Sequence, residues 1–334
     1  MKTSKTVFLT SSTIENLRQP VENDFQAIDA LILSELSSHV PLVQTIIHHI
    51  VHSGGKRLRP LVVLLTAHAC GYNNGVEHQE LAVIIEFIHT ATLLHDDVID
   101  KSDLRRGEKT ANAIWGNQAS VLVGDFLYSR AFQILARRSN VPVMKVLANT
   151  TNQIAEGEIW QLMNQNDPDV DESIYYEVIR RKTAQLFSAG TEIGAIISTE
   201  EESLRKAMTA FGLHLGLAYQ IIDDLLDYSE DASELDKNVG DDLAEGKATL
   251  PLIYAKQKTK PAQAKLIREA IKQGGLDNLK IIMQLIDETK ARKYTQQCAI
   301  KEAEKARTHL QALPLSIYRD ALESLTKFVI YRRY

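Results

Sequence analysis

The stretch ELAVIIEFIHTATLLHDDVIDKSDLRRG, residues 80–107, decides the fold class. Residues 80–99 are mostly apolar and have the periodicity of a long helix. The run ends on three aspartates within five residues, and two arginines follow directly. Like charges one turn apart destabilise a helix by a few tenths of a kcal/mol. We therefore expect a cation from outside the chain to compensate for the aspartates.

The pattern Asp-Asp-x-x-Asp occurs twice in the chain. At about 100° per residue, Asp96 and Asp100 lie about 40° apart on one helix face, and Asp223 and Asp227 have the same spacing. A few hard carboxylate oxygens suit Mg²⁺, which completes its shell with water and phosphate oxygens. One such motif is as well explained by a solvated acidic helix end, but two copies after apolar helices predict one shared metal site.

Cationic side chains accompany both acidic motifs. The cations are Lys56, Arg57 and Arg59 in GGKRLRP, Arg105 and Arg106 after the first motif, and Lys237 and Lys247 after the second. Arginine binds phosphate in a two-pronged fork and lysine as a point charge. Any one cluster is more often a solvated surface, but the alternation of acid and base favours two anionic ligands. The metal would hold one diphosphate, and Lys56, Arg59 and Arg106 would hold another without metal.

Three polar residues interrupt apolar helix faces. His89 lies seven residues before Asp96 and about 20° from it, so it either donates to the metal-free diphosphate or is a satisfied core histidine. Thr183 can bond the carbonyl four residues back and bend its helix, and Gln220 shares the face of Asp227. Neutral oxygens of this kind can stabilise a developing cation. For Thr183 and Gln220, however, the residues alone favour ordinary helix surface.

The composition indicates a helical globular protein. Of the 334 residues 44% are hydrophobic and 24% charged, and the 16 glycines and 8 prolines are fewer than usual. We predict a single all-α domain over residues 1–334, a large bundle with a central apolar cavity and a peripheral N-terminal segment at 1–20. The expected helical segments are 21–53, 80–99, 117–138, 141–162, 174–198 and 204–228, with polar loops at 164–173 and 229–249.

Charge, cysteines and hydropathy exclude several classes of protein. The net charge of −5 argues against a nucleic-acid partner. Cys70 and Cys298 have neither disulfide-framework nor zinc spacing. No apolar run is long enough to span a membrane, and the N-terminus lacks the pattern of a signal peptide. We expect a cytoplasmic protein without a transmembrane segment and with inert, reduced thiols.

Taken together, the motifs resemble those of the trans-polyprenyl diphosphate synthases. They are, in order, GGKRLRP, EFIHTATLLHDDVIDKSDLRRG, VLVGDFLYSRAF, KTAQLFSAG, LAYQIIDDLLDY and GDDLAEGKATLPL. The likeness runs from about residue 20 to 330 and is greatest to the bacterial octaprenyl diphosphate synthases. It implies the all-α isoprenoid synthase bundle, usually a homodimer. The implied reaction is the Mg²⁺-dependent condensation of isopentenyl diphosphate onto an allylic diphosphate such as farnesyl diphosphate, without a side-chain nucleophile, typically for a quinone side chain.

The resemblance also implies a role for each site residue. The allylic diphosphate would be held by Mg²⁺ on Asp96, Asp100 and Asp223, with Asp227 in support, and by Arg105, Lys182 and Lys237. The isopentenyl diphosphate would be held by Lys56, Arg59, His89 and Arg106. The implied catalytic residues are Lys182, Thr183 and Gln220, of which the last two shelter the allylic cation.

Small residues before the first aspartate motif indicate a long product. Ala91 and Thr92 lie one turn before Asp96 and leave the path open, whereas in the family an aromatic residue there shortens the product. A cavity floor is expected from helix 117–138, whose bulky candidates are Phe126, Tyr128 and Phe132, although core packing is their default role. One helical turn of about 5.4 Å is close to one isoprene unit, so helix 80–99 is long enough for several units but not clearly for eight. With the path open past Ala91 and Thr92, we predict a product near C40.

Three other classes compete with this interpretation. A class I terpene cyclase uses aspartate-rich helices but binds one diphosphate and has no use for the Lys56–Arg59 cluster. A non-catalytic subunit of a heteromeric synthase should have a decayed aspartate motif, and both are intact here. A purely structural or cation-buffering protein does not explain the alternation of acid and base. The C-terminal FVIYRRY differs from many family tails, which leaves the closure of the site by the tail open.

Overall fold

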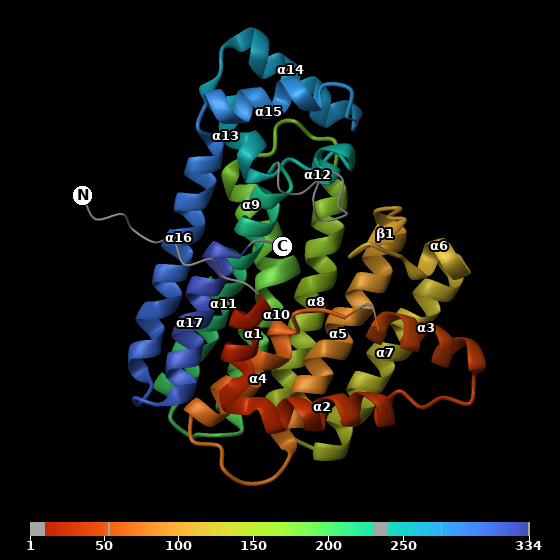
Figure 1. Ribbon diagram of the computed structural model, residues 1–334, viewed down its shortest axis with the longest axis vertical. Helices are drawn as coiled ribbons and strands as arrows, with labels where there is room; N and C mark the ends of the chain where they lie inside the picture. The colour runs from red at the N-terminus through yellow and green to blue at the C-terminus, as the bar shows by residue number, and fades with distance from the viewer. Residues whose placement is uncertain (1–10, 53, 230–238, 275, 333–334) are drawn as a thin grey trace.

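Long helices lie side by side along the molecule (Figure 1), and the computed structural model describes residues 11–52, 54–229, 239–274 and 276–332. The elements of the N-terminal half are α1 (Ser11–Arg18), η1 (Gln19–Val21), α2 (Glu22–Glu35), α3 (Pro41–His52), α4 (Leu58–Ala69), α5 (Glu77–Ile99), β1 (Leu104–Arg105), β2 (Glu108–Lys109), α6 (Ala111–Trp115), α7 (Asn117–Arg138) and α8 (Val141–Met163). The elements of the C-terminal half are α9 (Glu172–Ile179), η2 (Arg180–Ala184), α10 (Gln185–Ile196), α11 (Glu202–Leu226), α12 (Asp241–Ala244), α13 (Leu250–Lys258), α14 (Pro261–Gln273), α15 (Leu279–Glu288), α16 (Ala291–His309), η4 (Leu310–Ala312) and α17 (Ile317–Tyr331).

The all-α prediction is confirmed. Within the described residues the β structure is one antiparallel pair of two-residue strands, with Leu104 opposite Lys109 and Arg105 opposite Glu108. This hairpin follows the first aspartate motif directly. It therefore turns the two arginines back toward the end of α5.

The predicted helix boundaries are closest where periodicity is uninterrupted. The segment 117–138 coincides with α7 at both ends. The segment 21–53 is divided into α2 and α3, because Pro41 occupies the first position of a new helix, where its missing N–H costs nothing. The segment 174–198 is interrupted by η2, a π-helical turn.

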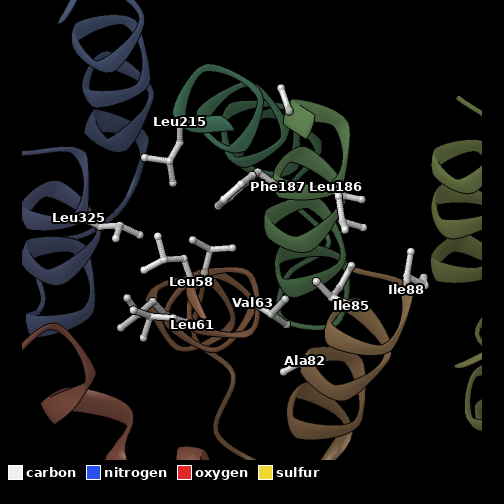
Figure 2. Packing of buried hydrophobic residues seen from close by; sticks show 14 of the residues in the cluster. Leu58, Leu61, Val63, Ala82, Ile85, Ile88, Leu186, Phe187, Leu215 and Leu325 are labelled. Atoms are coloured by element: carbon white, nitrogen blue, oxygen red, sulfur yellow. The ribbon is translucent and has the colours of Figure 1, made fainter. Parts of the chain in front are cut away.

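Helix α4 is the centre of the core. Nearly all of its residues are buried, which fits a helix that is apolar on most of its faces. Figure 2 shows Leu58, Leu61 and Val63 of α4 among side chains from α5, α10, α11 and α17. Removing one such buried leucine side chain typically costs about 2–5 kcal/mol of stability. This packing fixes α4, and with it the GGKRLRP segment at its start.

Two glycines allow α10 and α11 to touch along their backbones. A Cβ on Gly212 would lie 2.5 Å from the carbonyl oxygen of Phe187, and one on Gly216 would lie 2.6 Å from Cα of Ala184. Neither helix could keep its place with a larger residue there. The close approach sets Thr183 beside Gln220 on the neighbouring helix.

The ends of the chain and the upper helices complete the fold. Part of the N-terminal segment predicted to be peripheral forms α1, whose Ile14 and Leu17 are buried in the core, and residues 1–10 lie outside the described residues. A second apolar cluster, built mainly by α13, α14 and α15, lies at the top of Figure 1. Ala248 packs against both clusters, so the two cores are joined.

The structure also bears on two further predictions, the lack of a membrane-spanning helix and the state of the two cysteines. Among the described residues no helix is long and apolar enough to cross a membrane. Cys298 is buried and Cys70 is partly buried, and neither is in a disulfide. Burial raises the pKa of Cys70 to about 12, so its thiolate is scarce at neutral pH.

Candidate functional site

A cavity of about 660 Å³ opens where α4, α5, α8, α9, η2 and α11 meet. Both acidic motifs and the basic clusters contribute to its wall. The predicted site residues that line it are Lys56, Arg59, His89, Asp96, Asp100, Arg105, Arg106, Lys182, Thr183, Gln220 and Asp223. The sequence-based prediction that the two acidic motifs share one cleft is therefore realised in the structure. Two predicted residues remain, Asp227 and Lys237, and Lys237 lies outside the described residues.

The first motif divides its aspartates between two tasks. Asp96 and Asp100 face the cavity, where Asp100 lies 3.1 Å from the Nζ atom of Lys247. Asp97 follows Asp96 directly and therefore lies on a different face of the helix. It is buried and accepts two hydrogen bonds from Arg105, at 2.7 and 2.9 Å. Arg105 thus pairs with a carboxylate of the protein and also lines the cavity.

The second motif presents its first two aspartates to the cavity. Asp223 accepts a hydrogen bond of 3.1 Å from Arg332. Asp224 accepts one of 2.6 Å from the hydroxyl of Tyr175 and one of 2.7 Å from the amide of Gln220. Burial raises the pKa of Asp224 to about 8. Asp223 is therefore the more available of the two for a metal ion.

Asp227 is not directed as the helical spacing suggested. Among the described residues that line the cavity it is absent, and its carboxylate accepts the backbone N–H groups of Asp241 and Asp242 at 3.2 Å. These N–H groups open α12 and have no partner within that helix. Because α11 ends at Leu226, the last aspartate ties the following segment to the helix. The expectation that Asp223 and Asp227 face one cleft together is wrong in this respect, and metal support by Asp227 stays a prediction.

Glu158 is a site residue that the sequence reasoning missed. Its carboxylate lies 2.6 Å from Nζ of Lys182, which in turn is 3.5 Å from Asp96. Burial raises the pKa of Glu158 to about 7, against the opposing effect of Lys182. The preceding Gly157 permits the contact, since a Cβ there would lie 2.9 Å from the backbone nitrogen of Lys182. In the sequence, the pair Gly157–Glu158 is only a weak indication that two helices approach closely here.

The π-helical turn η2 places Thr183 in the cavity wall. The N–H of Gln185 donates to the carbonyl of Arg180, five residues back. A threonine inside a helix can bond a carbonyl four residues back, but the hydroxyl of Thr183 donates to the amide oxygen of Gln220 at 2.8 Å. Gln220 then donates to Asp224. The two polar residues that the sequence left as ordinary surface form a hydrogen-bonded chain in the cavity.

The basic group lies on the α4 side of the same cavity. The Nη1 atom of Arg59 is 3.1 Å from Nε2 of His89, and its guanidinium lies 4.6 Å from the ring centre of Phe187. Burial, with Arg59 and Arg106 nearby, lowers the pKa of His89 well below its usual range. The imidazole is neutral, and its Nε2 accepts because a guanidinium can only donate. The proton of His89 is consequently on Nδ1, which is the nitrogen that can donate to a diphosphate.

Arg332 was also missed, although the C-terminal sequence had been noted as a departure. It donates to the backbone carbonyl of Tyr219 at 3.0 Å and to Asp223 at 3.1 Å. Its guanidinium stacks 3.7 Å over the ring of Tyr219. Arg332, at the end of the described residues, is thereby fixed beside the second acidic motif.

The residues expected to control product length are only partly in the cavity. Thr92 lines it, whereas Ala91 is fully buried in the core. None of the three aromatic candidates for the floor lines a described cavity. Tyr128 stacks with His95 and Phe132, at 6.5 and 6.4 Å between ring centres, so its role is packing beside α5.

Comparisons with known proteins agree with this geometry. A sequence model described as polyprenyl synthetase matches residues 40–288. The chain is 47% identical over 318 residues to the all-trans-nonaprenyl-diphosphate synthase (geranyl-diphosphate specific) of Rhodobacter capsulatus, covering 95% of this chain and 98% of that one. It is 46% identical over 320 residues to the octaprenyl diphosphate synthase of Escherichia coli K12, covering 96% and 99%.

Solved structures show the same likeness over the whole fold. A decaprenyl diphosphate synthase from Rhodobacter capsulatus superposes with a TM-score of 0.90 at 42% identity, covering 95% of this chain and 98% of the other. A polyprenyl synthase from Caulobacter crescentus, complexed with calcium and isoprenyl diphosphate, superposes with a TM-score of 0.92 at 40% identity, covering 96% and 98%.

Proposed function

Because this chain belongs to the polyprenyl synthetase family, we propose that it extends farnesyl diphosphate or a similar allylic starter to an all-trans product of about eight isoprene units, as in its octaprenyl relative. The chain is a prenyltransferase, and its family condenses isopentenyl diphosphate onto allylic diphosphates. One observation carries the proposal. Two carboxylate motifs and a separate basic group line the same cavity, which therefore offers places for two diphosphates.

The carboxylates fit a divalent metal, which we propose to be Mg²⁺. Asp96, Asp100 and Asp223 are hard oxygen donors that line one cavity, and each lies within 3.5 Å of a lysine or arginine nitrogen. Those contacts indicate a surplus of negative charge that cations balance. When bound, Mg²⁺ would neutralise the diphosphate and favour its departure. The Caulobacter relative was solved with calcium, a cation with the same preference for oxygen.

The protein's own residues would divide the remaining work. Lys182 and Lys247 lie among the aspartates and would bind the leaving diphosphate as its C–O bond breaks and the electron pair departs with it. Lys237 and Arg105 are proposed to assist them. Lys56, Arg59, Arg106 and Nδ1 of His89 would hold the isopentenyl diphosphate. Its double bond would then form the new C–C bond, and the departed diphosphate would accept the proton whose loss restores the alkene.

Thr183 and Gln220 are placed to shelter the cation formed in between. Their hydrogen-bonded oxygens lie in the wall of the cavity that both charged groups line. Dipoles that are already oriented stabilise a developing charge without reorganising. No nucleophilic side chain is required for this role.

The competing classes are not favoured. A terpene cyclase does not need the second basic group, yet Lys56, Arg59 and Arg106 all line the cavity. The relatives that match nearly the whole chain are chain-lengthening synthases. A quinone side chain as destination and a cytoplasmic location remain part of this proposal, and its basis is the likeness to the octaprenyl synthase.

The experiment that tests the proposal is a product assay with the purified chain. Farnesyl diphosphate, labelled isopentenyl diphosphate and Mg²⁺ should give chains of about C35–C45, because the cavity is open at the level of Thr92. Mass spectrometry of the dephosphorylated products gives their length. A product that stops at C15 or C20 would contradict the proposed length. Cyclised products without consumption of isopentenyl diphosphate would instead support a cyclase.

We also propose a homodimer. Apolar side chains on α7 and α8 are unusually exposed, at 66% for Leu122, 59% for Ile159 and 74% for Met163. Exposed apolar surface of this kind commonly marks a protein interface. Sedimentation velocity should show a particle of twice the chain mass of 37.4 kDa, and Leu122→Glu should shift it toward the monomer. A monomeric parent protein at micromolar concentration would rule the dimer out.

A further inference from the structure

A second cluster of metal-ligating side chains lies at the far end of α5 from the catalytic cavity. It consists of Asp24 on α2, His68 near the end of α4 and His78 in the first turn of α5. Asp96 follows His78 by 18 residues of sequence, which is about 27 Å along a helix. In Figure 1 the end of α4 and the start of α5 lie at the lower end of the bundle, and α2 packs against α5. The cluster is therefore separate from the cavity described above.

The three side chains converge on one point. Nε2 of His68 is 2.8 Å from Oδ2 of Asp24, and Nε2 of His78 is 2.9 Å from Oδ1 of the same carboxylate. Their ligand atoms all lie within 4.8 Å of one another. Ligand atoms around a tetrahedral Zn²⁺ with bonds of about 2.0–2.2 Å are about 3.3 Å apart. The two His–Asp separations are slightly shorter than that value and no separation exceeds 4.8 Å, so small side-chain movements would bring the three atoms to a common ion.

Both ring nitrogens of His68 face hydrogen-bond acceptors. Its Nε2 faces a carboxylate, and its Nδ1 faces the backbone carbonyl of Tyr72 at 3.2 Å. Both partners can only accept, whereas a neutral imidazole has a single N–H. The ring is satisfied at both nitrogens in two cases, as an imidazolium or as a metal ligand through Nε2 with Nδ1–H donating to Tyr72. The second arrangement is the usual one for a metal-binding histidine, whose other nitrogen donates to a carbonyl.

The surroundings hold both rings in place. The ring of His68 stacks on Tyr318 of α17, with 4.9 Å between centres and 17° between planes. His78 is 3% exposed, and its ring centre lies 4.6 Å from that of Tyr72. The amide of Gln79 contacts Asp24 at 2.8 Å and provides either an orienting donor or, after rotation, a fourth oxygen. Ligands fixed in this way lose little freedom on binding.

We propose that Asp24, His68 and His78 bind one Zn²⁺ ion in a structural site. Two imidazoles and a carboxylate are a donor set that suits zinc, whereas Mg²⁺ prefers oxygen alone. The ion would fasten α2 to the α4–α5 junction. Those two helices carry Arg59 and Asp96 at their other ends, so the site secures the helices that carry the catalytic residues without touching substrate.

The test is a direct measurement of zinc on the full chain. Chelator-treated protein is given Zn²⁺ in the presence of millimolar Mg²⁺, and bound metal is counted by mass spectrometry after gel filtration. We expect about one zinc per chain and a rise in Tm of a few degrees, because a ligand that binds only the folded state stabilises it. The variants His68→Gln and His78→Gln keep a donor toward Asp24 but should weaken zinc binding by at least about tenfold.

Two control variants and a spectrum separate this site from other causes. Asp96→Asn should retain the zinc, and so should His214→Gln, in which the lost histidine also contacts a carboxylate, that of Glu302 at 2.7 Å. Co²⁺ in place of zinc should give the intense visible bands of a four-coordinate ion, which an all-oxygen site does not give. Zinc that is retained in both His68→Gln and His78→Gln, or lost in Asp96→Asn, overturns the proposal. So does a parent protein that binds none, which leaves His68 as an imidazolium.

Discussion

Asp96→Asn lowers the turnover of isopentenyl diphosphate by about 10³-fold, with little change in stability. Asp96 lies in the cavity wall beside Lys182, at 3.5 Å from its Nζ atom. Burial alone would lower the pKa of Lys182, but Asp96 and Glu158 outweigh it and raise that pKa. The asparagine would replace a proposed carboxylate ligand of the metal with a neutral amide and would remove one unit of negative charge from the cavity. The steady-state rate of isopentenyl diphosphate incorporation at saturating Mg²⁺ measures the loss.

The control lies seven residues further on. Asp103 is exposed in the hairpin segment after α5 and does not line the cavity. Asp103→Asn makes the same chemical change and should retain the parent rate within about twofold, as expected of a surface substitution. Asp223→Asn should reproduce the loss seen for Asp96→Asn, since its carboxylate faces the same cavity. Turnover within tenfold of the parent in either cavity variant would refute the proposed metal site.

Thr92→Phe shortens the product to about C20 or less, because a ring one helical turn below Asp96 fills the cavity about 6 Å from the diphosphate. Thr92 is the residue of the small pair that lines the cavity, and its neighbour Ala91 is already enclosed by the core. The aromatic side chain therefore has only the cavity to occupy. The product distribution is measured with geranyl diphosphate as starter, so that a shortened cavity can still accept the substrate.

A matched variant separates volume from the loss of the hydroxyl. The Thr92 hydroxyl donates to the carbonyl of His89 at 2.7 Å within α5. Thr92→Val removes that bond with almost no change in size, and it should keep the parent product length. Equal products from Thr92→Phe and the parent would show that the growing chain does not pass Thr92.

Local periodicity was sufficient to predict the fold class and the direction of the aspartates in the first acidic motif. The 3.6-residue repeat determines which residues share a helix face, and this is why Asp96 and Asp100 meet the cavity while Asp97 turns into the core. The same reasoning matched α7 at both ends, since its periodicity is unbroken and Gly116 precedes it. The alternation of acidic and basic clusters indicated the metal-free diphosphate group, whereas the resemblance to a known family supplied the roles of Arg105, Lys182 and Lys237.

The parts that the sequence could not predict depend on contacts between distant segments. Asp227 has the helical spacing of a cavity residue, but its carboxylate instead accepts hydrogen bonds from the N–H groups at the start of α12. Glu158 reaches Lys182 only because Gly157 lets two helices approach. Arg332 lies more than a hundred residues from Asp223, and no local pattern indicates that the two meet.

Because the hydrogen-bonded ring at Arg180–Ala184 is wider than that of an α-helix, the number of residues in this segment affects where its side chains point. Such a ring holds one residue more than a regular turn, so removing one of its residues, for example Arg181, is expected to restore an ordinary α-helix. The residues that remain in the turn would then shift by one position, about 100° around the helix, while α9 and α10 kept their faces. Lys182 would swing away from Glu158 and Asp96, while the buried apolar side chains of α10 kept their places. A deletion in this segment is therefore expected to yield a folded but misaligned site, whereas most substitutions here would alter chemistry and leave the alignment intact.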